Sequence, residues 1–248
     1  MDTVTKSYDI NFCLPIPEVL ENDRVRLTPF IPRLHAESLF EKLSAHPEIF
    51  RYLPFGPYSS IDEFLTNLVE NRIRKDPEDV LFAIFDKTKP SQTLNGSKNA
   101  PGALAGVIGF LNTSAPNLAT EIGFVMILPQ FQRTHVTSNA IGLLLNFTLN
   151  PPSTTYPEVL GLRRVVWKAN SANKASIRAA ERMGFTVEGI LRWDRVLPID
   201  REGNGLKVRE TDPKRDHQGR DTVVLSLCWD NWEAGVKEHV QKVMNRVE

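Results

Sequence analysis

The fold is decided by residues 164–190, which read RVVWKANSANKASIRAAERMGFTVEGI. The first five residues, Arg164 to Lys168, form a β-rich run that is typical of a strand. Lys174 to Met183 is predicted to be a helix, and Gly184 is placed to end it, because glycine readily adopts the positive φ found after a helix. Phe185 to Trp193 has the composition of a second strand. This order predicts a helix packed against a sheet.

The rest of the chain supplies further strands and amphipathic helices around this unit. Ser60 with Glu63 matches a capping box at a helix start. Ala103–Leu111 and Glu121–Leu128 resemble an antiparallel hairpin, and the helix that follows them can cross between parallel strands. We predict strands over Arg24–Thr28, Val80–Phe85, Ala103–Leu111, Glu121–Leu128 and Thr222–Trp229, and helices that begin near Pro32 and Ser60 or span Ser138–Leu149 and Trp232–Val247.

These elements predict an α/β fold in which helices pack on a mixed sheet. We expect one domain, residues 24–248, preceded by an irregular N-terminal arm, residues 1–23. The polar segments near 87–102 and 198–221 are predicted to be surface-loop insertions. Both interrupt pairs of strands, so neither is expected to link two separate cores.

Composition excludes several classes of protein. The 248 residues include 30 Lys and Arg and 30 Asp and Glu, so the formal net charge is zero. A balanced charge argues against a general nucleic-acid-binding protein, which needs a basic face. No apolar run approaches the roughly 18 residues of a membrane span, and the N-terminus lacks a signal pattern. We therefore expect a cytoplasmic protein with no membrane or nucleic-acid partner. The five histidines are scattered, and we expect no metal.

The segment Leu128–Ala140 joins an apolar strand to an amphipathic helix. A helix start presents unpaired N–H groups and the positive end of the helix dipole, which together suit phosphate oxygens. Arg133 adds a cation, and the hydroxyls of Thr134, Thr137 and Ser138 add donors. Taken alone, the segment is better explained by Thr137 or Ser138 capping the helix.

The quoted stretch carries a second, more specific pattern. Asn173 to Ser176 reads N-x-x-S, residues 181–185 read E-R-M-G-F, and residues 187–189 read V-E-G. A strand followed by N-x-x-S, a helix, [EK]-[RK]-x-G-F and x-x-E-G resembles the C-terminal half of the GCN5-related N-acetyltransferases (GNAT). More narrowly, it resembles the RimJ/RimL branch of that superfamily.

The resemblance extends upstream, with one departure. The strand Glu121-Ile122-Gly123-Phe124, Pro129 and the helix after them are similar to the RimJ/RimL branch, and the similarity runs from about Arg24 to Trp229. The superfamily's pyrophosphate loop usually reads [QR]-x-x-G-x-[GA], whereas residues 132–137 read Gln-Arg-Thr-His-Val-Thr, without a glycine. The loop can still donate backbone amides, because helical φ and ψ do not require glycine. The departure therefore concerns the loop contacts more than the fold.

The resemblance implies that acetyl-CoA binds where two parallel strands splay apart in a mostly antiparallel sheet. These strands would be Glu121–Leu128 and Arg164–Lys168, with helices on both sides. The splayed strand would offer free amides to the pantetheine arm, and the following loop and helix start would hold the phosphates. The cofactor-binding residues implied are Met126, Ile127, Gln132, Arg133, Thr134, His135, Val136, Thr137, Ser138, Asn173 and Ser176.

The resemblance also implies a direct attack of an amine on the thioester, which needs a base and an acid. Glu121 is the candidate base, and Ser176 is the hydroxyl expected near the sulfur. An exposed carboxylate at a strand end and a polar residue on a first helical turn explain these two equally well. Trp193 and Asp194 are candidate substrate-binding residues, although core packing or solvation explains them equally well.

We therefore expect a monomeric or homodimeric acetyltransferase that moves an acetyl group from acetyl-CoA to a primary amine. The amine acceptor is a protein N-terminus or a small amine, and its identity stays open because a fold specifies a donor site better than an acceptor. Two alternatives remain open. One is a catalytically silent CoA-binding module of the same fold, and the other is a protein-interaction module that uses the charged loop 198–221.

Overall fold

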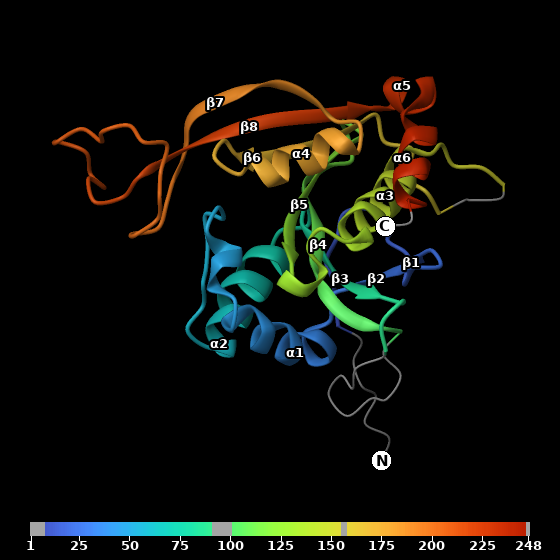
Figure 1. The fold of residues 1–248 in the computed structure, drawn as a ribbon, viewed down its shortest axis with the longest axis horizontal. Coiled ribbons are helices and arrows are strands. Elements are labelled where there is room, and N and C mark those ends of the chain that lie inside the picture. Colours follow the sequence, from blue (N-terminus) through green and yellow to red (C-terminus); the bar gives the residue numbers. More distant parts are fainter. Residues whose placement is uncertain (1–7, 91–100, 155–157, 247–248) are drawn as a thin grey trace, which may run out of the picture.

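The computed structural model describes residues 8–90, 101–154 and 158–246, and an eight-stranded sheet runs through its centre. The strands are β1 (Leu20–Glu21), β2 (Val25–Pro29), β3 (Val80–Asp86), β4 (Ala103–Ser114), β5 (Ala119–Ile127), β6 (Arg164–Asn170), β7 (Thr186–Val196) and β8 (Gly219–Cys228). Their order across the sheet is β1-β2-β3-β4-β5-β6-β8-β7 (Figure 1). Every neighbouring pair is antiparallel except β5 and β6, which run parallel. The predicted α/β fold with a mixed sheet is confirmed.

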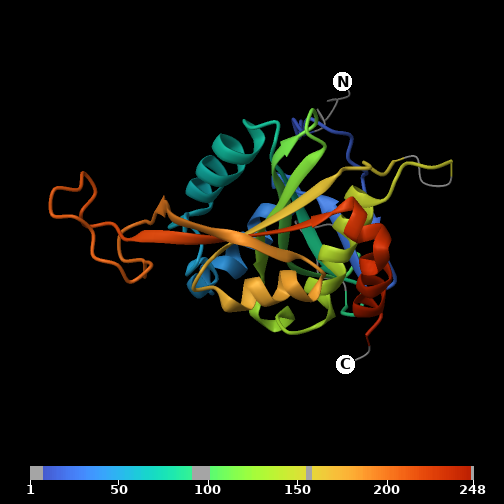
Figure 2. The same ribbon diagram turned by 90° about the horizontal axis from the view of Figure 1, so that it is seen from above.

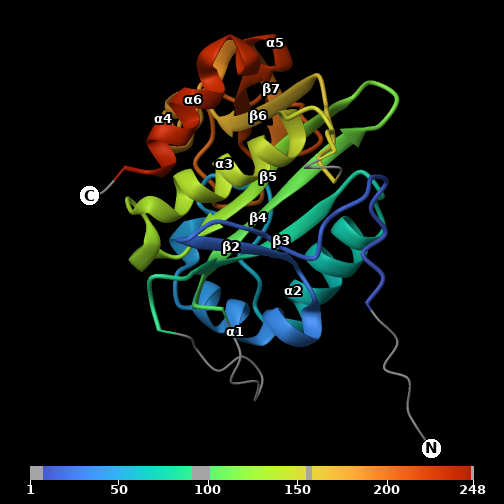
Figure 3. The ribbon, with the colours of Figure 1, turned by 90° about the vertical axis from the view of Figure 1, so that its right-hand side faces the viewer.

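Helices cover the sheet, and the central strands are buried accordingly. The helical segments are α1 (Pro32–Ser44), η1 (Pro47–Phe50), α2 (Ile61–Phe64), η2 (Leu65–Arg74), η3 (Pro129–Phe131), α3 (His135–Leu149), α4 (Lys174–Arg182), α5 (Trp229–Asn231), η4 (Trp232–Val236) and α6 (Lys237–Met244). Helices α1 and α2 lie on one side of the sheet, and α3 with α6 lies on the other (Figure 3). All seven residues of β3 are buried, which is why its sequence is continuously apolar up to Asp86.

Local signals in the sequence place most helix ends correctly. Ser60 Oγ accepts a hydrogen bond from the Glu63 N–H at 3.1 Å, which confirms the predicted cap. Gly184 follows α4 with a φ of 89°, as a helix stop requires. The last helix was wrongly predicted as continuous, because Gly235, with a φ of 122°, interrupts it between α5 and α6.

The crossover helix α3 begins at His135, three residues before the predicted Ser138. The reason is that Thr134, rather than Thr137 or Ser138, caps it, with Thr134 Oγ1 accepting the Val136 N–H at 3.3 Å. The residues expected to precede the helix therefore form its first turn.

The arm and the loops differ in part from the prediction. Leu20–Glu21, near the end of the predicted arm 1–23, pairs with β2 as β1, while residues 1–7 lie outside the described part of the chain. Most of the predicted loop near 87–102 is also outside it. The loop near 198–221 ends earlier than predicted, because β8 begins at Gly219. This loop and the β7–β8 hairpin extend away from the rest of the molecule (Figure 2).

Within the described ranges, no helix combines the length and the apolar composition that crossing a membrane requires.

Candidate functional site

The parallel strands β5 and β6 separate partway along their length. Ala119–Ile122 pairs with Arg164–Trp167, but β5 continues to Ile127 and β6 to Asn170 without further pairing between these two fully described strands. The separation coincides with a bulge in β5. Gly123 pairs with Gly109 and Met126 with Val107, so two residues of β5 lie opposite one residue of β4 between these pairs. A bulge bends its strand and disrupts the ladder locally. The strand pair thus opens at Gly123.

Phe124 occupies the bulge with a φ of 51°. Non-glycine residues rarely adopt this region, and holding one there costs about 1–3 kcal/mol. Its side chain is buried, with 4% exposed, so packing holds it in this conformation. Such strain is commonly found at binding and catalytic sites.

The opened part of β5 presents backbone groups away from β4. The Leu128 N–H donates to Ala105 O on β4 at 2.9 Å. Because successive peptide groups of a strand face opposite sides, Met126 also faces β4, whereas Val125 and Ile127 face the opening. The Ile127 carbonyl accepts from Gln132 Nε2 at 2.9 Å. Of the two predicted strand residues, Ile127 therefore has its N–H at the opening, whereas the Met126 backbone faces β4. Val125 also faces the opening, and the sequence analysis missed it.

The start of α3 follows this strand closely. Its first-turn N–H groups have no acceptor within the helix, and the Val136 N–H is taken by Thr134 Oγ1. Thr134 Oγ1 in turn donates to Phe131 O at 2.7 Å. The amides of His135 and Thr137 are the remaining candidate donors, because the Ser138 N–H donates to the carbonyl of the cap residue Thr134 within the helix. The Arg133 side chain beside them is exposed.

The two missing glycines have a local explanation. His135 and Thr137 lie in the first turn of α3 and are not among the residues with positive φ. The residue of this loop that does have positive φ is Arg133, at 62°. Glycine is therefore not needed at 135 or 137 for backbone reasons.

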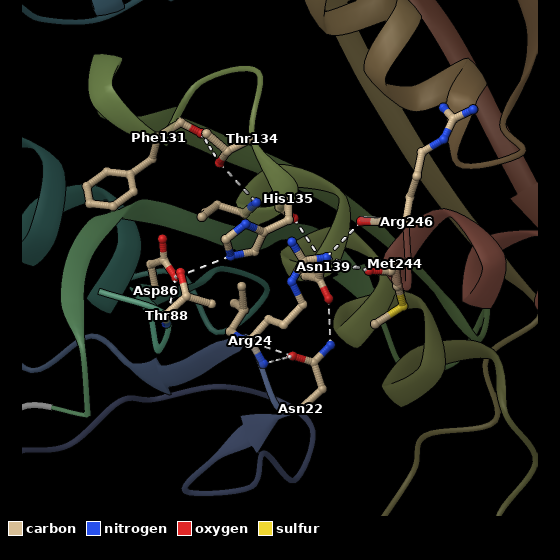
Figure 4. Close-up of polar contacts among 12 residues, drawn as sticks. Asn22, Arg24, Asp86, Thr88, Phe131, Thr134, His135, Asn139, Met244 and Arg246 are labelled. Atoms are coloured by element: carbon tan, nitrogen blue, oxygen red, sulfur yellow. Dashed lines mark hydrogen bonds and ion pairs between the residues drawn. The ribbon is translucent and has the colours of Figure 1, made fainter. Parts of the chain in front are cut away.

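The imidazole of His135 does not extend into the loop. Its Nε2 lies 3.2 Å from Asp86 Oδ1, and the Asp86 side chain is 1% exposed (Figure 4). A buried carboxylate needs polar partners, and Thr88 supplies others through its N–H and hydroxyl. His135 was predicted to contact the cofactor, but its side chain is committed to Asp86, and only its backbone amide remains available for that role.

A buried amide fixes the position of α3 from the opposite side. Asn139 Nδ2 donates to the carbonyls of His135 and Met244, and its Oδ1 accepts from Asn22 Nδ2 at 2.6 Å (Figure 4). Arg24 Nη1 also donates to the Met244 carbonyl, at 3.3 Å. Segments from both ends of the described chain thus hold the helix start, and no sequence motif marked Asn139 for this role.

Asn173 and Ser176 both make local contacts at the start of α4. Asn173 Oδ1 accepts the Ser176 N–H at 3.1 Å, so Asn173 caps the helix. Ser176 Oγ accepts from the buried indole of Trp167 on β6 at 3.0 Å. The Ser176 hydroxyl proton is therefore free of that bond and can be donated elsewhere.

Glu121 is a buried carboxylate rather than the exposed strand-end group that was the alternative interpretation. Glu121 is 8% exposed to solvent. Lys168 Nζ lies 2.8 Å from Oε2, and Asn112 Nδ2 donates to the same oxygen at 2.9 Å. The Asn112 N–H also donates to Asp79 Oδ1 at 3.2 Å. Asn112 thus donates hydrogen bonds to two carboxylates, those of Glu121 and Asp79. Burial raises the pKa of Asp79 to about 6.

Two arginines that the sequence analysis missed lie near this carboxylate. The guanidinium of Arg72, on η2, lies 4.7 Å from the ring centre of Phe55 and 5.0 Å from that of Phe124. Arg220, on β8, is 7% exposed. Both interact electrostatically with Glu121, and burial lowers the pKa of each guanidinium. These arginines come from elements far apart in the sequence, so only the folded structure shows that both lie near Glu121.

The two predicted substrate residues lie in an irregular part of β7. Trp193 is 44% exposed, has a φ of 53° and covers Gly219. Asp194 Oδ2 accepts the Thr222 hydroxyl at 2.7 Å, and Thr222 Oγ1 accepts from Arg220 Nε. Asp194 is thereby linked to the arginines around Glu121, whereas Trp193 lies at the edge of the hairpin.

Among the described residues, no group of three or more His, Cys, Asp or Glu side chains is arranged to hold a metal ion.

An opened parallel strand pair followed by an anion-accepting helix start is the arrangement expected of a nucleotide-cofactor transferase, and comparison with known families identifies the class. The family model described as an acetyltransferase (GNAT) domain matches residues 24–186, so the chain belongs to the GNAT family. A search of curated proteins gave no match.

Solved structures agree with this assignment. The chain is similar to a GCN5-related N-acetyltransferase from Brucella melitensis, with 26% identity and a TM-score of 0.70 over 93% of this chain and 86% of that one. It is similar to a probable GNAT-family acetyltransferase from Chromobacterium violaceum, with 27% identity and a TM-score of 0.65 over 88% and 96%. It shares the fold of Mycobacterium smegmatis RimJ in complex with CoA-disulfide, with 14% identity and a TM-score of 0.61 over 88% of each chain.

Proposed function

We propose that this protein is an acetyl-CoA-dependent N-acetyltransferase of the RimJ/RimL-like branch that acetylates a primary amine by direct attack. The acceptor is a protein N-terminus or a small amine. The observation that carries the proposal is the opening of β5 from β6 at the Phe124 bulge, directly ahead of the start of α3. The unpaired amides of β5 are followed along the chain by the N-terminus of α3. This order fits a long thioester that ends in phosphates.

The residues that would hold acetyl-CoA lie on three elements. The N–H groups of Val125 and Ile127 would donate hydrogen bonds to the pantetheine arm. The N–H groups of His135 and Thr137, with the hydroxyls of Thr137 and Ser138, would donate to the pyrophosphate. Arg133 is exposed beside that helix start and would add a positive charge. Asn173 and Ser176 would contact the cofactor from the start of α4.

The proposed chemistry has two proton transfers, one to Glu121 and one from Ser176. Bound acetyl-CoA supplies an acetyl thioester. Glu121 removes a proton from the attacking amine, and because Lys168 and Asn112 both contact Oε2, Oε1 is the oxygen that faces the amine. Ser176 donates its hydroxyl proton toward the departing sulfur while Trp167 holds its oxygen.

The experiment is to measure acetyl transfer by the Glu121→Gln variant, which keeps the size of the side chain and the acceptor oxygen for Asn112. We expect turnover to fall by about 10²–10⁴-fold with little change in acetyl-CoA affinity, and the loss to be greatest at low pH. Glu37→Gln, on the exposed face of α1, is the matched control. Turnover within a few-fold of wild type across the pH range would exclude Glu121 as the base.

One observation favours a second candidate, the catalytically silent CoA-binding module. Asn173 and Ser176 already have structural partners in Ser176 N and Trp167 Nε1. A silent module would be stabilised by acetyl-CoA through mass action and would acetylate no amine. A transferase would show both properties, so a thermal-shift assay and a turnover assay on the same preparation separate the two.

A further inference from the structure

The side chains around Glu121 carry more positive than negative charge. Among the described residues, Lys168 pairs with Glu121 at 2.8 Å, and Arg195 lies 3.5 Å from Asp194. Arg72 and Arg220 remain, and Asp79 is the further carboxylate in electrostatic contact with Arg72. Even with Asp79 ionised, these four cations face three carboxylates, those of Glu121, Asp194 and Asp79. The cluster therefore has an excess of guanidinium charge.

Arg72 lacks a hydrogen-bond acceptor of its own. Within the described residues, no oxygen of the protein accepts a hydrogen bond from its guanidinium, whose central carbon lies over the rings of Phe55 and Phe124. These two rings are 6.0 Å apart and hold the group in place. A partly buried guanidinium of this kind presents a rigid fork of donors that matches a carboxylate or phosphate group.

Arg220 has polar contacts but no carboxylate at ion-pair distance among the described residues. Its Nε donates to Thr222 Oγ1 at 3.1 Å and its Nη1 to Tyr52 O at 3.5 Å. Both acceptors are neutral, so they satisfy donors without neutralising the charge. The carboxylates of Asp194 and Glu121 offset its charge electrostatically, and the Thr222 hydroxyl links Arg220 to Asp194.

The position of Arg72 connects this charge to the proposed reaction. Phe124, which the guanidinium contacts, is the bulge residue where β5 opens, and Glu121 lies three residues earlier on the same strand. Arg72 interacts electrostatically with Glu121 as well. An amine that reaches Glu121 therefore brings its neighbouring substituent toward Arg72.

We propose that the acceptor is a primary amine that carries an anionic group, a carboxylate or a phosphate, a few bonds from the amine, and that Arg72 binds that group. The inference rests on the proposed acetyltransferase function. It assigns Arg72 as a specificity-determining residue, and it predicts discrimination against amines with a second positive charge.

The test compares acceptors that differ only in charge. β-Alanine, propylamine and 1,3-diaminopropane share a three-carbon primary amine and end in a negative, neutral or positive group, and 2-aminoethyl phosphate supplies the phosphate arm. The tripeptides Ser-Glu-Gly, Ser-Gln-Gly and Ser-Lys-Gly repeat the comparison for a peptide N-terminus. We expect kcat/KM to be greatest for the anionic member, by roughly 10- to 100-fold over the neutral one. The relative rates of β-alanine and the phosphate distinguish the two anions.

Variants at Arg72 make the assignment specific. Arg72→Met keeps an apolar side chain against Phe55 and Phe124 and removes the charge. The ratio of kcat/KM for β-alanine to kcat/KM for propylamine is therefore expected to fall to about 1. Arg72→Lys keeps the charge without the fork and is expected to retain part of the preference. Arg74→Met, on the same helix but paired with Asp9 and Glu70 at the surface, is the control. Retained stabilisation by acetyl-CoA verifies that each variant is folded.

The possible failures are distinguishable. If amines are acetylated without regard to their charge, or if Arg72→Met keeps the preference, this inference is wrong and the acetyltransferase function stands. If no amine of either series is acetylated although acetyl-CoA stabilises the protein, the proposed function itself fails, and this inference fails with it.

Discussion

Replacing Asp79 by asparagine tests the electrostatics of the site most directly. Asp79 is 7% exposed, and its Oδ1 accepts the Asn112 N–H at 3.2 Å. Burial raises its pKa from 3.8 to about 6. Asparagine has the same shape and keeps an oxygen for Asn112, so the variant removes the titration while preserving the contact.

The sign of the effect follows from proton linkage. Between about pH 4 and pH 6 the unfolded chain releases the Asp79 proton while the folded chain retains it, so the free energy of unfolding falls as the pH rises. The difference between 3.8 and about 6 corresponds to about 3 kcal/mol at about 1.4 kcal/mol per pKa unit. Asparagine avoids this loss but introduces an amide donor in a buried place, which costs about 1 kcal/mol. We expect a net gain of about 2 kcal/mol near pH 7.

The assay is urea unfolding of wild type and variant at a series of pH values from about 4 to about 8. The variant is expected to be more stable than wild type near neutrality and no more stable near pH 4. Comparison at each pH cancels every other titrating group that the two proteins share. A stability difference that stays constant over this range would refute the raised pKa of Asp79. Acetyl transfer by the variant is expected to persist. A loss of more than about 100-fold would make Asp79 a rival to Glu121 as the base.

Three further predictions concern the cofactor site and the core. Arg133→Glu is expected to weaken thermal protection by acetyl-CoA, because a carboxylate at the helix start repels the pyrophosphate; unchanged protection would remove Arg133 from the site. Asn173→Ala is expected to cost about 1 kcal/mol through loss of the α4 cap, whereas Asn173→Asp keeps a capping oxygen, and a weaker CoA affinity in both variants would identify a cofactor contact by calorimetry. His35, whose Nδ1 accepts the Ile31 N–H, has its pKa lowered to about 4 by burial. The neutral His35 side chain therefore stabilises the fold fully above about pH 6.5, and about 3 kcal/mol of the free energy of unfolding is lost as the pH falls toward 4. His35→Asn is expected to flatten that part of the acid-unfolding curve. An unchanged curve would contradict the lowered pKa.

The order and type of the elements could be predicted because their signals lie in contiguous residues. The strand, helix and strand of residues 164–190 appear as β6, α4 and β7, and Gly184 ends the helix with positive φ. Helical periodicity and glycine stops depend on neighbours within about one turn. The same locality explains the errors at element ends. The choice of Thr134 as the cap of α3 depended on a bond from its hydroxyl to Phe131 O, which no pattern distinguishes from the neighbouring hydroxyls.

The candidate site was only partly predictable. Sequence position and family resemblance predicted Glu121, Ile127 and the start of α3 as site residues, because they lie in or directly after a recognisable strand. The Phe124 bulge was not predicted, since it arises where β5 has one more residue than the facing part of β4. The side of β5 that faces the opening depends on which peptide groups pair with β4, so the assignment of Val125 rather than Met126 required the register.

The charges around Glu121 depended entirely on long-range packing. Arg72 comes from η2, Lys168 from β6 and Arg220 from β8, and each is an ordinary charged residue in its own segment. Only after the sheet has formed do these side chains lie near one carboxylate, out of bulk water. Burial then lowers the pKa of the two guanidinium groups, because it disfavours their charged form. A linear sequence records which charges a chain carries, but desolvation and distance, which govern what those charges can bind, are properties of the folded molecule.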